Sequence, residues 1–174
     1  SKTAASCFVP LTEGGGVNNL DDFCELLKCG ADKVSVNTSD VTNPNIIKKS
    51  SDKFGNQCVV LAIDAIESKA MPCGFEVTTH GGRKRTNLDV LSWAREGIKN
   101  GACEILLTSM NADGMKTGDN LHLTKLIAEN VSVPVIVSGG GGNPKEIVYA
   151  ARQSGASEVL VVSIIHFWIQ LDTA

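Results

Sequence analysis

Residues 9–16 of this 174-residue chain read VPLTEGGG, and residues 133–141 read VPVIVSGGG. A second pair of similar segments follows, GADKVSV at residues 30–36 and GASEVLV at residues 155–161. The first glycines of the two glycine runs are 125 positions apart, and so are the leading glycines of the second pair. A repeat at a constant offset indicates that one structural unit is used more than once along the chain.

The repeated segments belong to a longer series of short apolar runs separated by amphipathic stretches. Continuous apolar runs of this length are typical of buried parallel strands. The stretches between them open on helix-start residues such as Asn19 and Asn43-Pro44, and they end near glycines. We predict strands at residues 7–11, 33–37, 59–64, 104–108, 134–138 and 158–162, and helices at residues 19–30, 43–55, 87–101, 121–130 and 144–155. This alternation favours a parallel sheet covered by helices.

Four βα units fill the 125-residue offset, because the strands that begin near Val59 and Glu104 lie between the two copies. Eight such units would need about 250 residues, the usual size of a (β/α)8 barrel. The chain has six predicted strands of this series. We therefore predict one α/β domain over residues 1–174, an incomplete (β/α)8 TIM barrel without the first two βα units. A small extra strand is expected at residues 75–79, followed by a polar loop at residues 81–85.

The composition excludes several classes of protein. The net charge of −3 argues against nucleic acid as the main partner. The sequence contains no run of 18 apolar residues, so it does not predict a membrane span. Six cysteines without a Cys-x-x-Cys pair predict reduced thiols in a cytoplasmic protein. His80, His122 and His166 lack the spacing of metal ligands, so we predict surface or packing roles for them and no metal site.

In barrels of this kind the active site lies at the carboxyl ends of the strands. Two loops there are rich in glycine, which lets backbone N–H groups approach an anion, and nearby polar side chains add donors. We predict two phosphate sites, formed by Gly15, Gly16, Asn37 and Thr38 and by Ser138, Gly139, Gly140 and Ser163. Two sites imply a substrate with a phosphate at each end. The alternative is that the glycines only form tight turns.

Three further residues near strand ends are candidates for contact with the substrate. Asp64 ends a strand after five apolar residues, where a carboxylate can act as a general acid or base, or alternatively as a helix cap or structural partner. Asp113, followed by Gly114 after the fourth strand, is either a substrate ligand or a turn residue. Thr108 is a candidate hydrogen-bond donor to the substrate.

Charged residues stand at the opposite, amino ends of the strands. Lys33, Glu104 and Glu158 each begin a strand. Such charges are either solvated or paired, and then stabilise the barrel, or they form a ring around an opening through its base. In the second case Asp32 would be an exposed docking residue.

The strand ends resemble those of the cyclase subunit of imidazole glycerol phosphate synthase, a family of histidine biosynthesis. The matching segments are residues 9–17, 30–38, 62–65, 101–109, 113–114, 138–140 and 163–167, in collinear order over nearly the whole chain. A sister isomerase of the pathway shares the fold and both phosphate sites. It usually has an acidic residue after the threonine of the fourth strand end, where this chain has Ser109, so the resemblance favours the cyclase.

The resemblance implies a reaction without a cofactor. Ammonia from a glutaminase partner would pass through the barrel and attack a bisphosphorylated formimino-ribulosyl intermediate. Cyclisation and cleavage would then yield imidazole glycerol phosphate and an aminoimidazole carboxamide ribotide. By resemblance, Asp64 is one of two aspartates acting as general acid and base, and the two glycine-containing sets bind the phosphates. Lys33 and Glu104 would belong to a charged gate, and Asp32 would contact the glutaminase.

The chain also departs from the family's pattern. Family members begin with two more βα units that carry the other catalytic aspartate, and a last helix follows residues 166–167. By comparison the chain is truncated at both ends. We therefore expect weak turnover by the isolated chain and self-association through exposed strand edges. A non-catalytic, self-associating barrel fragment is the alternative to an enzyme.

Overall fold

The computed structural model of the chain describes residues 9–43, 45–110, 117–138 and 155–160. The elements in chain order are β1 (Thr12–Gly14), α1 (Leu20–Lys28), β2 (Lys33–Val36), α2 (Thr38–Thr42), α3 (Asn45–Phe54), the 3-10 turn η2 (Asn56–Cys58), β3 (Val59–Glu67), β4 (Phe75–Thr79), β5 (Lys84–Asp89), α4 (Val90–Lys99), β6 (Glu104–Ser109), α5 (Thr117–Ala128), β7 (Val135–Ser138) and β8 (Glu158–Leu160).

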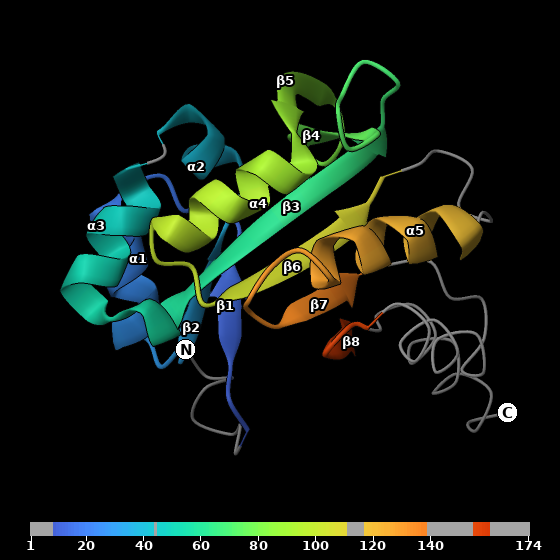
Figure 1. The fold of residues 1–174 in the computed structure, drawn as a ribbon. Coiled ribbons are helices and arrows are strands. Elements are labelled where there is room, and N and C mark those ends of the chain that lie inside the picture. Colours follow the sequence, from blue (N-terminus) through green and yellow to red (C-terminus); the bar gives the residue numbers. More distant parts are fainter. Residues whose placement is uncertain (1–8, 44, 111–116, 139–154, 161–174) are drawn as a thin grey trace, which may run out of the picture.

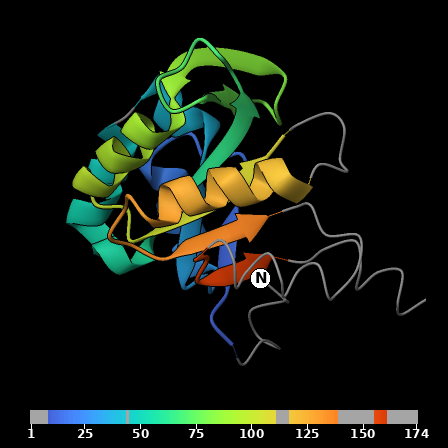
Figure 2. The ribbon, with the colours of Figure 1, turned by 45° about the vertical axis from the view of Figure 1, so that its right-hand side comes forward.

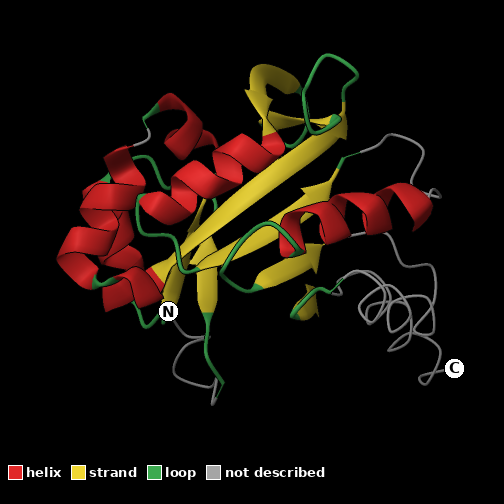
Figure 3. Ribbon diagram, in the orientation of Figure 1, coloured by secondary structure: helices red, strands yellow, loops and turns green. Residues whose placement is uncertain are grey.

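Six parallel strands form the sheet in the order β1-β2-β3-β6-β7-β8, which is also their order along the chain. Crossovers between parallel strands are almost always right-handed, so this order brings the connecting helices to one face of the sheet. Figure 1 shows α4 along β3, and Figure 2 shows α5 beside β7. The secondary-structure colouring of Figure 3 separates the helices from the sheet. The fold is an open part of a parallel α/β barrel, as predicted.

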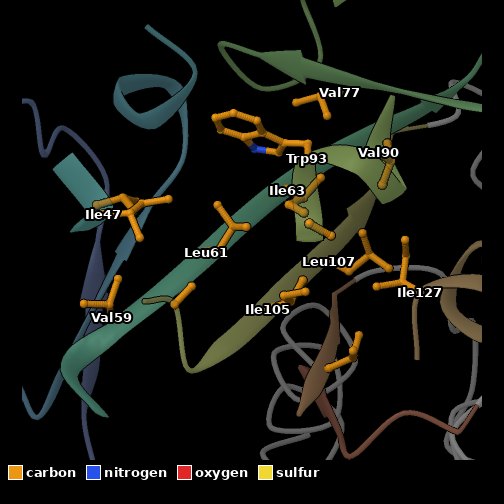
Figure 4. Close-up of a cluster of buried hydrophobic side chains, with 14 of the residues drawn as sticks. Ile47, Val59, Leu61, Ile63, Val77, Val90, Trp93, Ile105, Leu107 and Ile127 are labelled. Atoms are coloured by element: carbon orange, nitrogen blue, oxygen red, sulfur yellow. The ribbon is translucent and has the colours of Figure 1, made fainter. Parts of the chain in front are cut away.

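The face of the sheet toward the helices holds the hydrophobic core. Side chains alternate between the two faces of a strand, so Leu61 of β3 shares a face with Ile105 and Leu107 of β6. All three are buried, and they lie with Trp93 of α4 and Ile127 of α5 in one cluster (Figure 4). Burial of one such aliphatic side chain contributes about 1.5–3 kcal/mol, so this layer fixes the helices on the sheet.

The other face of the sheet corresponds to the interior of a closed barrel. In the register, Ser35 lies beside Val60, Ala62 lies beside Leu106, and Leu106 lies beside Ile136. This middle layer is largely apolar, whereas charged and polar residues occupy the two ends of the same strands. The open sheet thus separates two polar regions, one at each end.

Side-chain caps fix where two helices begin. Asn19 Oδ1 accepts hydrogen bonds from the backbone N–H groups of Asp21 (2.8 Å) and Asp22 (2.9 Å), which confirms the predicted start of α1. The Asp89 carboxylate accepts from the N–H of Ser92 (3.0 Å) at the start of α4. Such a cap typically contributes about 1 kcal/mol of stability.

The predicted first strand at residues 7–11 is wrong over its described part. β1 begins at Thr12, which lies beside Lys33 of β2. Pro10 has no N–H group to donate to a strand ladder, so the ladder does not extend back through it. Leu11 is held instead by Asp32, whose carboxylate accepts its N–H (2.8 Å) and whose N–H donates to its carbonyl (2.8 Å).

The predicted polar loop at residues 81–85 is wrong at its end. Residues from Lys84 onward form β5, an antiparallel partner of β4, and α4 begins at Val90 rather than near residue 87. Lys84 and Arg85 are exposed in this strand, which explains why their sequence resembles a loop. The extra strand predicted at residues 75–79 is confirmed as β4.

The other predicted elements agree with the structure in type. The helix predicted at residues 43–55 is α3, and the one at residues 121–130 is the later part of α5. The short helix α2 was not anticipated by any pattern, and the helix predicted at residues 144–155 lies almost entirely outside the described residues.

In the described parts of the chain no helix is long and apolar enough to cross a membrane. The cysteines described there are free thiols.

Gly97 of α4 packs closely against Leu61 of the sheet. A Cβ atom at this position would lie 2.3 Å from Cδ2 of Leu61 and 3.7 Å from Cδ1 of Ile47. Gly97→Ala should destabilise the protein by about 1–3 kcal/mol through overpacking, although alanine favours a helix over glycine by about 1 kcal/mol. Urea unfolding measures the effect. Gly97→Ala should lower the stability by a smaller amount when Leu61 is also replaced by alanine, because the contact is then relieved. If Gly97→Ala alone left the stability unchanged or raised it, the close contact would be contradicted.

Candidate active site at the carboxyl ends of the strands

A cavity of about 510 Å³ opens at the carboxyl ends of β1, β2, β3 and β6. It is lined by Gly15, Gly16, Val17, Asn18, Ser35, Val36, Asn37, Ser39, Ala62, Asp64, His80, Leu106 and Thr108. Five residues predicted from the sequence meet here, since Gly15, Gly16, Asn37, Asp64 and Thr108 all line it. Parallel strands end at the same edge of a sheet, which brings residues far apart in the chain into one site.

Asp64 is the acidic residue among the described residues that line this cavity, and it lies within β3, which continues to Glu67, rather than at the end of the strand as predicted. It lies beside Thr108 in the register and is half-buried. Burial raises the pKa of its carboxyl group above the usual range, while a hydrogen bond from the Asn37 side chain acts in the opposite direction. A carboxyl group with a raised pKa can accept and release a proton closer to neutral pH, which is the property a general acid or base needs.

Asn37 sits at the end of β2 and orients this carboxylate. Its side-chain amide donates the hydrogen bond to Asp64, and only Nδ2 can be that donor. Its Oδ1 atom is buried, and within the described residues it has no hydrogen-bond partner. An unpaired buried polar atom is costly, so this oxygen is a candidate acceptor for a donor on a ligand.

The glycine loop after β1 leaves open space next to the cavity. Gly15 (φ 92°) and Gly16 (φ 72°) are both in the left-handed region, and no atom lies within 4 Å of a Cβ placed on either of them. Glycine adopts this conformation without strain, and it leaves room for a ligand against the backbone. These two residues therefore satisfy the steric requirement of the predicted phosphate loop.

The start of α1 contributes little to an anion site at this loop. Asn19 already accepts the N–H groups of Asp21 and Asp22, and both of these first-turn residues are acidic. Their charge offsets the positive end of the helix dipole. Any anion at this loop would be held by the amides of Gly15 and Gly16 rather than by the helix.

The remaining predicted ligands are only partly described. Thr38 is the first residue of α2. Ser138 ends β7 beside Thr108, on the same face of the sheet, but it does not line the cavity. Asp113, Gly114, Gly139, Gly140 and Ser163 lie outside the described residues.

The charged residues predicted at the amino ends do meet. Lys33 of β2 forms an ion pair with Glu104 of β6 across β3. The hydrogen bond to Glu104 is the main reason why the pKa of Lys33 is raised, and the charge of Glu158 adds to it. Asp32 is exposed, and its carboxylate is engaged by the Leu11 backbone.

The β4–β5 hairpin is held by a buried carboxylate. Glu76 accepts hydrogen bonds from Nη1 of Arg85 (2.7 Å) and from the N–H of Asn87 (2.9 Å). Burial alone would raise its pKa, but these bonds outweigh burial and lower the pKa of Glu76 overall. The hydroxyl of Thr78 donates to the carbonyl of Asp64 (3.1 Å), so the hairpin is attached to the site itself.

His80 lines the cavity, although its sequence predicts only a surface or packing role. It follows β4 directly, and Oγ1 of Thr79 lies 3.0 Å from its Nδ1 atom. The sequence signal that could have located it is the Gly81-Gly82 turn inside a long connection, where loops are often functional.

His122, in contrast, packs against the ring of Phe75 with a 5.7 Å centroid distance, as expected of a packing residue. Among the described side chains, no group of three possible ligands is placed to hold a metal ion.

Comparison with known proteins identifies the family. Residues 1–169 match the histidine biosynthesis protein family. This chain belongs to that family. It is 48% identical over 168 residues to the imidazole glycerol phosphate synthase subunit HisF of Trichormus variabilis, covering 95% of this chain and 65% of that protein. It is 49% identical over 166 residues to the HisF subunit of Bacillus licheniformis, covering 95% of this chain and 66% of that protein. The chain thus spans just under two thirds of the length of these relatives.

The raised pKa of Asp64 has a consequence for stability. The folded state holds this proton more tightly than the unfolded chain, so stability falls as pH rises from the ordinary carboxyl pKa through the folded one. Asp64→Asn cannot ionise and should therefore be more stable than the wild type at pH 7. The difference in stability between Asp64→Asn and the wild type should become smaller as the pH approaches 4. Urea unfolding at the two pH values measures it.

Glu76→Gln provides the matched control with the opposite sign. The pKa of Glu76 is lowered, so its contribution to stability is present above the ordinary carboxyl pKa and is lost as pH falls through the folded pKa. This variant should be less stable than the wild type by about 1–3 kcal/mol at pH 7, with a smaller difference at low pH. Effects of the same sign in both variants would contradict the electrostatic description of the two carboxylates.

Proposed function

We propose that the chain carries the cyclisation site of an imidazole glycerol phosphate synthase. The reaction is the attack of ammonia on a bisphosphorylated formimino-ribulosyl intermediate, followed by ring closure and cleavage. The products are imidazole glycerol phosphate and an aminoimidazole carboxamide ribotide. The observation that carries this proposal is the single cavity in which the glycine loop, Asn37, Asp64 and Thr108 meet.

Asp64 acts as a general acid or base in this proposal. Its support is the position of the carboxyl group in the cavity, its raised pKa and its hydrogen bond from Asn37. Ring closure and bond cleavage both move protons on the substrate, and a positioned carboxyl group can accept or return them. Asn37 keeps the carboxylate oriented, and Thr108 adds a hydroxyl donor next to it.

The phosphates would bind at the two glycine-containing sets. The open space over Gly15 and Gly16 supports the first, since Asn37 lines the same cavity; Thr38, which follows Asn37, is proposed from the family resemblance. The second set, Ser138, Gly139, Gly140 and Ser163, is proposed from the family resemblance and the sequence repeat, together with Asp113 and Gly114 as substrate contacts. A substrate with a phosphate at each end would then span the carboxyl ends of the sheet.

Ammonia would reach the site from the opposite end of the strands. The family resemblance suggests a glutaminase partner there, with Asp32 at the contact. The ion pair of Lys33 and Glu104 lies on the face of the sheet that also carries Asp64, at the far end of the strands. A charged pair in this position supports the role of a gate, because separation of the two side chains would expose a path for ammonia along the inner face of the sheet.

Turnover by the chain alone should be weak. The resemblance implies a pair of aspartates, whereas Asp64 is the only carboxylate among the described residues that line the cavity. With ammonium salt as nitrogen source, Asp64→Asn should lower kcat for cyclisation by about 10²- to 10⁴-fold relative to the unmodified chain. Product formation from the bisphosphorylated intermediate measures the rate.

Asp52→Asn is the control for this substitution. Asp52 is an exposed carboxylate paired with Lys48 (2.9 Å) on α3, away from the cavity, so its replacement should leave the rate unchanged. Unchanged turnover in Asp64→Asn would remove Asp64 from the reaction. An equal loss in both variants would show that the effect is not specific to the cavity.

A self-associating assembly is the second candidate. Within the described strands, β1 and β8 each pair on one side only, and Leu160 of β8 is 44% exposed. Exposed strand edges of this kind favour pairing with another chain. Such an assembly would bury the inner face of the open sheet.

Light scattering tests the self-association directly. We expect a mass of a dimer or larger at micromolar concentration, together with a smaller mass when Leu160 is replaced by lysine, because a charge opposes edge pairing. A monomeric mass throughout would refute the assembly and leave the cyclisation proposal unaffected.

A further inference from the structure

Asp64 lies where one neighbouring strand of β3 replaces another. β6 pairs with β3 from Val60 to Ala65, so it occupies one edge of β3 along this length. On the other edge, β2 pairs with β3 as far as Leu61, and β4 pairs with β3 from Asp64 onward. A strand has two edges, so β4 continues the edge that β2 leaves. Asp64 is therefore the first residue of β3 at which the β4–β5 hairpin is attached.

Thr78 of β4 is the residue directly opposite Asp64 in the register. Directly opposite residues of antiparallel strands have Cβ atoms about 4.5–5.5 Å apart on one face of the sheet. Thr108 is the partner of Asp64 on β6, so Asp64 has a threonine as its cross-strand neighbour on each side. Thr108 lines the cavity, whereas Thr78 does not. Thr78 is thus placed to act on Asp64 without contacting a ligand in the cavity.

The hydroxyl of Thr78 is directed at the backbone of Asp64. Thr78 is fully buried, and its Oγ1 atom donates a hydrogen bond to the Asp64 carbonyl (3.1 Å). A buried hydroxyl is costly unless it is paired, so this bond ties the two residues together. It fixes the Asp64 backbone on the edge of β3 that faces away from β6.

The hairpin can hold Thr78 in place because it is anchored itself. Arg85 of β5 lies opposite Thr78, and its Nη1 atom donates to the buried carboxylate of Glu76 (2.7 Å). Thr86 of β5 donates from its hydroxyl to the carbonyl of Val77 (2.7 Å). These bonds join β4 to β5 on both sides of the Thr78 position, so β4 is a firm support for Asp64.

The Asp64 carboxylate depends on this support. Its side-chain hydrogen bond comes from Asn37, which follows the end of β2. Proton transfer needs a heavy-atom separation of about 2.6–3.2 Å between the carboxyl group and the reacting atom. A displaced Asp64 backbone would carry the carboxylate away from Asn37 and from the substrate at the same time.

We propose that Thr78 is a positioning residue for Asp64, whose hydroxyl holds the Asp64 backbone so that the carboxylate stays within reach of Asn37 and of the substrate. The inference rests on the proposed function, because it names the residue that positions the general acid or base of that reaction. Thr78 does not contact the substrate. Loss of its hydroxyl should therefore lower kcat and leave KM nearly unchanged.

Thr78→Val removes the hydroxyl and keeps nearly the same side-chain shape. With ammonium salt as nitrogen source, kcat of the full chain for the bisphosphorylated intermediate should fall about five- to tenfold, the effect of one lost hydrogen bond. Thr78→Ser keeps the hydroxyl and should retain a kcat close to that of the wild type.

The side-chain amide signal of Asn37 in the ¹⁵N-labelled chain gives a second readout that needs no turnover. Asp64→Ala removes the acceptor, so it defines the position of this signal without the hydrogen bond. In Thr78→Val the signal should move from its wild-type position toward that in Asp64→Ala. In Thr78→Ser it should stay at the wild-type position.

Thr86→Val is the matched control. Thr86 also donates to a backbone carbonyl within the hairpin, and its Oγ1 atom in addition accepts the N–H of Leu88 (3.2 Å). Its replacement removes at least as many hydrogen bonds from the hairpin as Thr78→Val, but none to Asp64. It should leave kcat and the Asn37 signal unchanged, and equal effects of the two variants would overturn the inference.

The Asn37 signal separates this inference from the cyclisation proposal. A wild-type signal in a folded Thr78→Val variant would refute the inference alone, even where cyclisation depends on Asp64. The expected movement of the signal without cyclisation by any variant would support the positioning role and refute the cyclase function. If Thr78→Val does not fold, Thr78→Ala replaces it, and equal Asn37 signals in Thr78→Ala and Thr78→Ser would overturn the role of the hydroxyl.

Discussion

Parallel hydrogen bonding between β2, β3 and β6 in one register is the interaction on which the rest of the structure depends. This register aligns Asp64 with Thr108 and places Asn37 at the end of the neighbouring strand. It also directs Leu61 and Ile105 together toward the helices. A slip by one residue would turn both sets to the wrong faces, so the burial of the core and the assembly of the site are specified by the same constraint.

The β4–β5 hairpin adds to this sheet what parallel strands alone do not provide. β3 extends beyond the end of β2, and β4 pairs with this extension. A buried Glu76 stabilises the hairpin through Arg85 and Asn87, and Thr78 joins it to the Asp64 carbonyl. The hairpin thus brings His80 to a cavity that is otherwise lined by the parallel strands and the loops that follow them. Its stability and the composition of the site are therefore linked.

The sequence predicted the parallel strands after the first, because continuous apolar runs such as residues 59–64 leave little choice of structure, whereas the first strand begins at Thr12 and not within residues 7–11. Asp64 and the glycine loop do line one cavity near the carboxyl ends of the strands, although β3 continues past Asp64 to Glu67. β5 was missed because its exposed residues, such as Lys84, have the composition of a loop. The role of Asn37 toward Asp64 depends on register between strands, and the place of His80 depends on a hairpin edge. Neither is a property of local sequence.

We propose that one cavity at the carboxyl ends of the strands binds the phosphorylated substrate beside Asp64. The most direct measurement is the change of backbone amide chemical shifts in the ¹⁵N-labelled chain on titration with the bisphosphorylated intermediate, in the Asp64→Asn variant, which should slow turnover. Saturable shifts centred on Gly15, Gly16, Asn37 and Thr108 are the predicted result. Shifts centred instead on the amino ends near Lys33 and Glu104, or no saturable shifts, would contradict it.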